Sequence, residues 1–253
     1  MNTPFCYWND ETLATKYFES LGFSVSKIPE VNTGRRCDFI IRDENNSYLI
    51  EAKKVEESTE PINIVDSEGD IELYSKTMAF SAKMTAKVHD AMKQLNSTAN
   101  EFEAGYKLIW FNITNRFTDT ADYERLLSTI YGLRRISCLD ESKSHISKGC
   151  YYYSPCAFLD YEDLDAVVVA TNSSIELWVN NHALMYKEFV RSELFKSPHS
   201  SVRDPSASID DRFIIADCNT DRNNKAEVAS FLHEKYKYTR IIETPLVEHY
   251  NVF

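Results

Sequence analysis

The sequence predicts an α/β protein with a mixed central sheet flanked by helices. Three patterns support this class: an amphipathic helix near the N-terminus, a β-hairpin over residues 37–54, and a wholly apolar run over residues 106–114. Helical periodicity alternates with short strand patterns along the first half of the chain, which is typical of α/β domains.

The first helix is predicted to begin at Asn9 or Asp10, either of which can cap its N-terminus. Gly22 ends the helix, and residues 23–28 follow as the first strand. The apolar positions form one stripe at helical spacing: Leu13, Ala14, Tyr17, Phe18 and Leu21. Glu11 lies at the edge of this stripe, from where its side chain can extend across a protein surface.

Residues 37–54 read CDFIIRDENNSYLIEAKK, two apolar runs joined by a polar turn cluster. This pattern predicts a β-hairpin. Residues two apart in a strand face the same way, so Glu51 and Lys53 share a face, as do Asp38 and Ile40. If Asp38 and Glu51 face the same side, two carboxylates converge beside a lysine. The alternative is an ordinary hairpin whose charges face water.

Two carboxylates without histidine or thiolate make a hard, all-oxygen site that suits Mg²⁺ or Mn²⁺ rather than zinc. The carbonyl of Ala52 points sideways from the strand and could add a ligand. A lysine at the position of Lys53 can orient or deprotonate a water, or neutralise charge on a phosphate in the transition state.

A second helix is predicted over residues 78–97, followed by a strand buried on both faces over residues 106–114 and a helix over residues 120–134. The buried stripe of the second helix is Phe80, Met84, Val88, Ala91, Met92 and Leu95. One flank of that stripe carries Lys83, Lys87 and Gln94. The first half therefore reads helix, three strands, helix, strand, helix.

The motif Asp38-x12-Glu51-x-Lys53, together with this element order, resembles the PD-(D/E)XK nuclease superfamily. Cys37 stands where the proline of the superfamily's name would be. The resemblance implies a restriction-endonuclease-like αβββαβ core over residues 1–135, with residues 136–253 as an α/β extension packed on it. It also implies a Mg²⁺-dependent endonuclease, with Mn²⁺ as a substitute, in which Asp38, Glu51 and Lys53 are catalytic.

The same resemblance assigns the metal to Asp38, Glu51 and the Ala52 carbonyl, with Glu11 assisting. Glu11, followed by Leu-Gly-Phe ending twelve residues later, resembles the first helix of the resolvase-like branch; the alternative is a glutamate that favours the helix dipole. In the resembled families a lysine or glutamine from the next helix reaches the site, which nominates Gln94, Lys87 and Lys83. The loop residues Arg35 and Arg36 either hold phosphate or form a solvated basic turn.

The rest of the chain is less informative. Residues 55–77 are acidic and are predicted to be an insertion or mobile loop. Tyr151-Tyr-Tyr either stacks on bases or packs in a core, of which packing is the commoner explanation. The remaining predictions are strands at 165–170, 174–179, 213–216, 241–242 and 246–247, helices at 182–196 and 225–238, and a loop at 197–211.

Composition excludes several classes of function. A net charge of −11 counts against a protein that coats nucleic acid non-specifically, although a local basic strip is compatible with a nuclease. The phosphate-loop and dinucleotide-binding glycine motifs are absent, so no nucleotide cofactor is expected. The six cysteines form no CxxC pair, which favours reduced thiols in a cytoplasmic protein. No apolar run has the length of a membrane span.

The sequence therefore predicts a nuclease acting on DNA, with RNA as the alternative substrate because the same metal chemistry acts on either phosphate. A homodimer or a partner subunit is expected, and restriction or anti-phage defence follows by resemblance only. The rival interpretation is a non-catalytic or partner-activated nuclease-fold subunit of a larger nucleic-acid-processing complex.

Overall fold

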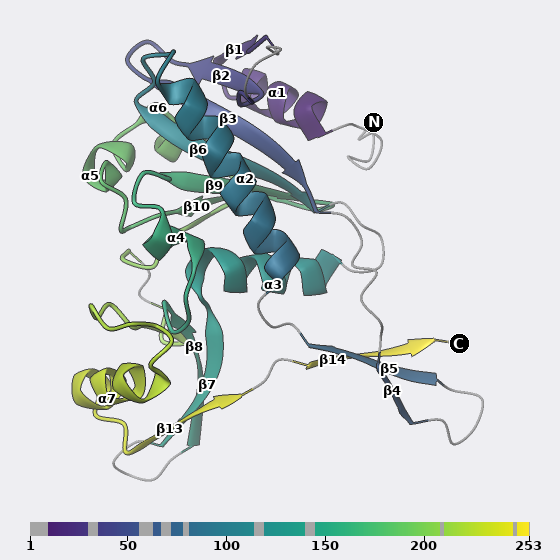
Figure 1. Cartoon of the computed structure of the whole chain (residues 1–253), viewed down its shortest axis with the longest axis vertical. Helices are drawn as coiled ribbons and strands as arrows, with labels where there is room; N and C mark the ends of the chain where they lie inside the picture. The colour runs from purple at the N-terminus through teal and green to yellow at the C-terminus, as the bar shows by residue number, and fades with distance from the viewer. Residues whose placement is uncertain are drawn as a thin grey trace. The chain divides into compact units, whose positions relative to one another are not determined.

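The computed structural model describes residues 10–29, 35–55, 63–66, 72–77, 81–113, 119–139, 145–207, 210–244 and 247–252 (Figure 1). The chain folds into two compact units that interleave along the sequence. Unit 1 comprises residues 1–56, 82–119 and 160–208, and unit 2 comprises residues 57–81, 120–159 and 209–253. A division at residue 135 therefore does not separate these units.

Unit 1 is built on a seven-stranded mixed sheet, which agrees with the predicted α/β class. In spatial order the strands are β1 (Ser24–Lys27), β2 (Phe39–Arg42), β3 (Ser47–Lys54), β6 (Tyr106–Ile113), β9 (Ala166–Thr171), β10 (Ile175–Val179) and β11 (Ser201–Arg203). The three central strands β3, β6 and β9 run parallel, while β1, β2 and β3 are joined antiparallel. β6 is buried along nearly its whole length, as its apolar sequence predicts.

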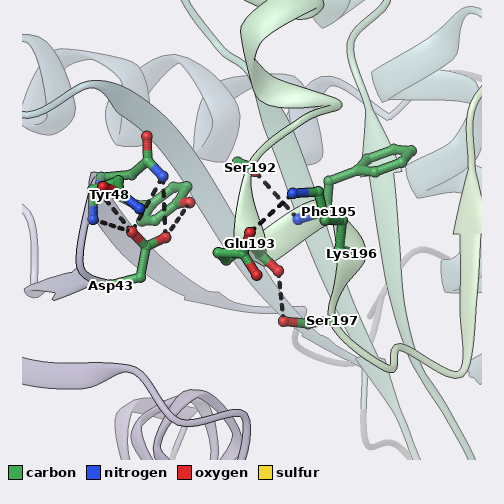
Figure 2. A network of polar contacts seen from close by, with 9 residues as sticks. Asp43, Tyr48, Ser192, Glu193, Phe195, Lys196 and Ser197 are labelled. Atoms are coloured by element: carbon green, nitrogen blue, oxygen red, sulfur yellow. Dashed lines mark hydrogen bonds and ion pairs between the residues drawn. The ribbon is translucent and has the colours of Figure 1, made fainter.

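The β2–β3 hairpin forms where it is predicted, and its polar turn supplies its own hydrogen bonds. Asp43 Oδ1 accepts the backbone N–H groups of Asn45 and Asn46, each at 2.7 Å, which fixes the turn. Tyr48 donates its hydroxyl to Asp43 Oδ2 at 2.9 Å, so the turn is tied to β3 (Figure 2). Figure 2 also shows Ser192 capping the short helix α6 (Glu193–Lys196), where its hydroxyl accepts the Phe195 N–H.

Helices cover both faces of the unit 1 sheet. α1 (Asp10–Ser20) ends before Gly22, whose φ of +91° is the left-handed conformation that glycine adopts readily. Leu13, Ala14 and Phe18 of α1 pack on the face of the sheet that carries Trp110. α2 (Ala82–Ala99) crosses the other face, close to β3 and β6 (Figure 1). Its buried stripe is the predicted one from Met84 to Leu95, with Thr98 added.

The order α1, β1, β2, β3, α2, β6 follows the prediction, but several details of unit 1 differ from it. The predicted helix at 182–196 is two short helices, α5 (Tyr186–Phe189) and α6. The predicted loop at 197–211 contains β11, which pairs parallel with β10 at the edge of the sheet. Phe80 lies outside the described residues, and α2 is described from Ala82.

Unit 2 contains a four-stranded sheet with a helical cover and a separate three-stranded sheet. The first sheet has the order β12 (Phe213–Ile215), β8 (His145–Tyr151), β7 (Arg134–Leu139) and β13 (Arg240–Thr244). The second has the order β14 (Val247–Val252), β5 (Glu72–Thr77) and β4 (Asn63–Asp66). The helices are α3 (Asp119–Tyr131), α4 (Ala157–Asp160), whose last residue falls in unit 1, and α7 (Lys225–Tyr236).

Of the two alternatives for residues 55–77, an insertion or a mobile loop, the loop is wrong for 63–66 and 72–77, which form β4 and β5 and pair antiparallel. The other residues of that stretch, apart from Val55, lie outside the described residues. Tyr151, Tyr152 and Tyr153 are all buried, so they pack in a core instead of offering exposed rings for bases to stack on. Within the described part of the chain, no helix is both long and apolar enough to cross a membrane.

Candidate active site

The candidate active site lies where β2 and β3 separate. The hairpin register pairs Phe39 with Ile50, and one step further it sets Asp38 opposite Glu51 on the same face of the sheet. The carboxylate of Asp38 curls toward β3 and accepts the backbone N–H of Ala52 at 2.7 Å. The two carboxyl groups are therefore held side by side by backbone geometry as well as by sequence position.

Lys53 joins this pair from the same face of β3. Its ammonium group donates to Glu51 Oε1 at 2.5 Å and to Gln94 Oε1 at 2.9 Å. Gln94 projects from α2, which covers this face, and its Nε2 donates to the carbonyl of Arg36 at 3.1 Å. The amide orientation of Gln94 is thus fixed at both ends, and a neutral acceptor holds the lysine beside the carboxylates.

Burial and like charge set the electrostatics of the pair. Glu51 is only 2 % exposed. Burial first, and then the neighbouring Asp38, raise the pKa of Glu51 to about 7, against the opposing effect of Lys53. The pKa of Asp38 is also raised, mainly by burial and further by Glu11, while the Ala52 N–H lowers it. Two adjacent carboxylates in this environment favour a shared cation over two bare negative charges.

The Cys37 thiol that precedes Asp38 is buried and protonated in the metal-free protein. Burial raises its pKa to about 12, so the sulfur stays protonated and is not a thiolate. The hard oxygen character expected of the site is therefore unchanged by the cysteine that precedes Asp38.

The other nominated residues lie around this centre in different roles. Glu11 forms an ion pair with Lys27 at 2.6 Å. Within the described residues no three His, Cys, Asp or Glu side chains gather to hold a metal, so Glu11 does not complete a three-carboxylate group. Arg36 pairs with Glu101, and Lys87 donates to the carbonyl of Lys54 at 2.9 Å. The remaining nominated side chains are exposed: Arg35 and Lys83.

Sequence reasoning missed Thr98. Its hydroxyl oxygen accepts the backbone N–H of Cys37 at 2.8 Å, directly before Asp38, and the residue is fully buried. A signal was present, because Thr98 follows Leu95 on the buried stripe of α2 and is a polar residue at a core position. A buried hydroxyl at such a position needs a partner, and here the partner is the chain leading into the site.

Comparison of the chain with family models, curated proteins and solved structures found no match. The argument for function therefore rests on the site itself: a buried carboxylate, Glu51, the partly buried Asp38 carboxylate, the Ala52 carbonyl, and a lysine held by a neutral amide. This set can bind a hard divalent cation and present a positive charge to an anionic substrate.

Proposed function

We propose that this protein is a Mg²⁺-dependent endonuclease that hydrolyses phosphodiester bonds of DNA, on a restriction-endonuclease-like core formed within unit 1. The observation that carries the proposal is the contact of the Asp38 carboxylate with β3 at Ala52, next to Glu51, together with the bond from Lys53 to Glu51. The αβββαβ order of the elements supports the same assignment, with β4 and β5 inserted after the third strand.

The residues present fit a divalent cation. Glu51 Oε2 is buried and accepts no hydrogen bond from any residue that the structure describes, and a buried carboxylate oxygen left in this state is costly. A cation held by Asp38, Glu51 and the Ala52 carbonyl would satisfy that oxygen with hard ligands of the kind Mg²⁺ and Mn²⁺ prefer. When bound, the metal would supply Lewis-acid activation of the phosphate and a lowered pKa for its bound water.

The chain's own contribution is orientation and charge. Lys53 is shared between the Glu51 carboxylate and the neutral oxygen of Gln94, so its ammonium group is held at a fixed place beside the carboxylates. From there it neutralises negative charge that develops on the phosphate, or orients the attacking water. Gln94 fixes Lys53 without adding a charge that would compete with the phosphate.

DNA is the proposed substrate and RNA the alternative, because no described contact of the site distinguishes a ribose from a deoxyribose. Lys54 follows Lys53 on β3, and Lys87 donates to its carbonyl, so both basic side chains are suited to phosphates that flank the cleaved bond. A role in restriction or anti-phage defence, in the cytoplasm and as a homodimer or with a partner subunit, belongs to the proposal through the resemblance alone.

The test compares wild type, Lys53→Met and Lys93→Met on plasmid DNA, single-stranded DNA and RNA, with Mg²⁺, Mn²⁺ or EDTA. Methionine keeps the length of the lysine stem and removes only its charge. Lys93 is the matched control, because it is an exposed lysine of α2 that precedes Gln94 in the chain and so lies about 100° around the helix from it. We expect Lys53→Met to lose about 10²–10³-fold in cleavage rate, the usual effect of removing one electrostatic contact to a transition state.

Equal cleavage by Lys53→Met and wild type would overturn the assignment of Lys53. Wild-type protein that cuts none of these substrates with either metal would overturn the proposal of a self-sufficient nuclease, and would favour the partner-activated or non-catalytic subunit. Preference for RNA over DNA would keep the site and change the substrate.

A further inference from the structure

The β2–β3 ladder stops one residue pair earlier than its register allows. Hydrogen-bonded pairs in an antiparallel ladder recur every second residue, and the step after Phe39 and Ile50 would pair Cys37 with Ala52. In that arrangement the Cys37 N–H would donate to the Ala52 carbonyl, and the Ala52 N–H to the Cys37 carbonyl. The observed partners of both N–H groups are different.

Residues 36–37, which lead into Asp38, form hydrogen bonds with α2 instead. The Cys37 N–H donates to Thr98 Oγ1 at 2.8 Å, and the Arg36 carbonyl accepts from Gln94 Nε2 at 3.1 Å. The Thr98 hydroxyl donates its own proton to the Gln94 carbonyl at 2.8 Å, which turns a lone pair of its oxygen toward Cys37. Two consecutive residues before Asp38 are therefore bound to a helix and not to β3.

Because the ladder ends early, the backbone N–H and carbonyl of Ala52 are not paired with Cys37. The Ala52 N–H donates to Asp38 Oδ2 at 2.7 Å, which anchors that carboxylate beside Glu51. In a strand the N–H and the carbonyl of one residue point to the same side, so the Ala52 carbonyl points, like its N–H, toward the chain that carries Asp38. The ladder donor for that carbonyl, the Cys37 N–H, is held by Thr98.

We infer that Thr98 is a positioning residue that ends the β2–β3 ladder early, and so reserves the Asp38 carboxylate and the Ala52 carbonyl for a divalent cation. The inference rests on the proposed function. Thr98 lies behind the chain that leads into Asp38 and acts through Cys37, whose buried amide it fixes. Partners of this kind hold the ligands of metal sites in place, and their loss typically weakens metal binding 10- to 100-fold.

The experiment compares Thr98→Val, Thr98→Ser and the control Val88→Ala, using Mn²⁺ as the probe. Valine keeps the shape of threonine without the hydroxyl, serine keeps the hydroxyl, and Val88 is a buried α2 residue ten positions earlier in the chain. Mn²⁺ affinity is measured by electron paramagnetic resonance, and amide hydrogen exchange of Cys37 and Ala52 is measured on metal-free protein. Circular dichroism establishes that each variant is folded.

We expect Thr98→Val to bind Mn²⁺ 10- to 100-fold more weakly than wild type. Because the released Cys37 N–H can then pair with the Ala52 carbonyl, the ladder should extend, and both amides should exchange more slowly relative to the rest of β3. Thr98→Ser should stay within about threefold of wild type in affinity, since the acceptor is retained. Val88→Ala should lower stability without changing the affinity or the relative exchange of the two amides.

The outcomes separate the two proposals. Wild-type affinity for Mn²⁺ in Thr98→Val, or unchanged Ala52 exchange in that variant, overturns the role of Thr98 while leaving the proposed function in place. Wild-type protein that binds no Mn²⁺ overturns the proposed metal site, and the role inferred for Thr98 is then overturned with it.

Discussion

Replacing Glu51 with glutamine should make the free energy of unfolding of the metal-free protein fall less as the pH rises. Glutamine has the shape of a protonated glutamate, so it mimics the form that the buried site favours. The folded-state pKa of Glu51 is raised from 4.5 to about 7, mainly by burial and then by Asp38. At about 1.4 kcal/mol per factor of ten in equilibrium, the ionised side chain costs the folded state about 3 kcal/mol.

The sign follows from proton linkage. Between pH 4.5 and 7 the folded protein keeps the Glu51 proton while the unfolded chain has lost it, so stability falls as pH rises. Between pH 5.5 and 8.5 the wild-type free energy of unfolding should fall about 2 kcal/mol more than that of Glu51→Gln. The assay is urea unfolding of both proteins in EDTA at these two pH values, followed by circular dichroism.

The control for losing any carboxylate is Glu103→Gln, because Glu103 is exposed. That variant should keep the wild-type dependence on pH. If Glu51→Gln and wild type instead lose the same stability between pH 5.5 and 8.5, Glu51 is ionised at little cost, and the account of a buried, crowded carboxylate pair is refuted.

Three further predictions follow from other parts of the structure. Gln94→Leu should slow DNA cleavage about tenfold in single-turnover assays, because Lys53 loses its neutral acceptor at 2.9 Å; an unchanged rate would remove Gln94 from the site. Asp165→Asn should also flatten the fall in stability between pH 5.5 and about 7, because burial raises the pKa of Asp165 to about 7; urea unfolding at pH 5.5 and 8.5 would show this, and an unaltered difference between the two pH values would contradict it. Gly132→Ala should cost about 3 kcal/mol or more, since a Cβ would clash with the Ser154 carbonyl oxygen, whereas Gly22→Ala, with open space, should cost only about 1–2 kcal/mol; thermal unfolding that ranks them equally would contradict this.

The hairpin could be predicted from the sequence because its information is local. Alternation of apolar residues, a polar turn from Asp43 to Asn46, and the two-residue period of a strand together set Asp38 and Glu51 on one face. The position of Gln94 near the site could also be predicted, since helical spacing puts Gln94 on the flank of the buried stripe of α2.

Other features depend on contacts between distant segments, which a single sequence does not specify. β7 begins with two arginines, and β8 carries Ser147, Lys148 and Gly149 in a row, so neither has enough apolar residues for a strong strand pattern of its own. The interleaving of the two units depends on which strands pair across long stretches of chain. The hold of Thr98 on Cys37 joins residues 61 positions apart, and a local pattern reveals only that Thr98 needs a partner.

The most direct test of the central claim is the nicking of supercoiled plasmid DNA by wild-type protein in Mg²⁺, with EDTA and Lys53→Met run beside it. Asp38, Glu51 and Lys53 as one metal-dependent centre predict cutting in Mg²⁺, none in EDTA, and a loss of at least about 10²-fold in the variant. Cutting that persists in EDTA, or that Lys53→Met performs as fast as wild type, would contradict the claim.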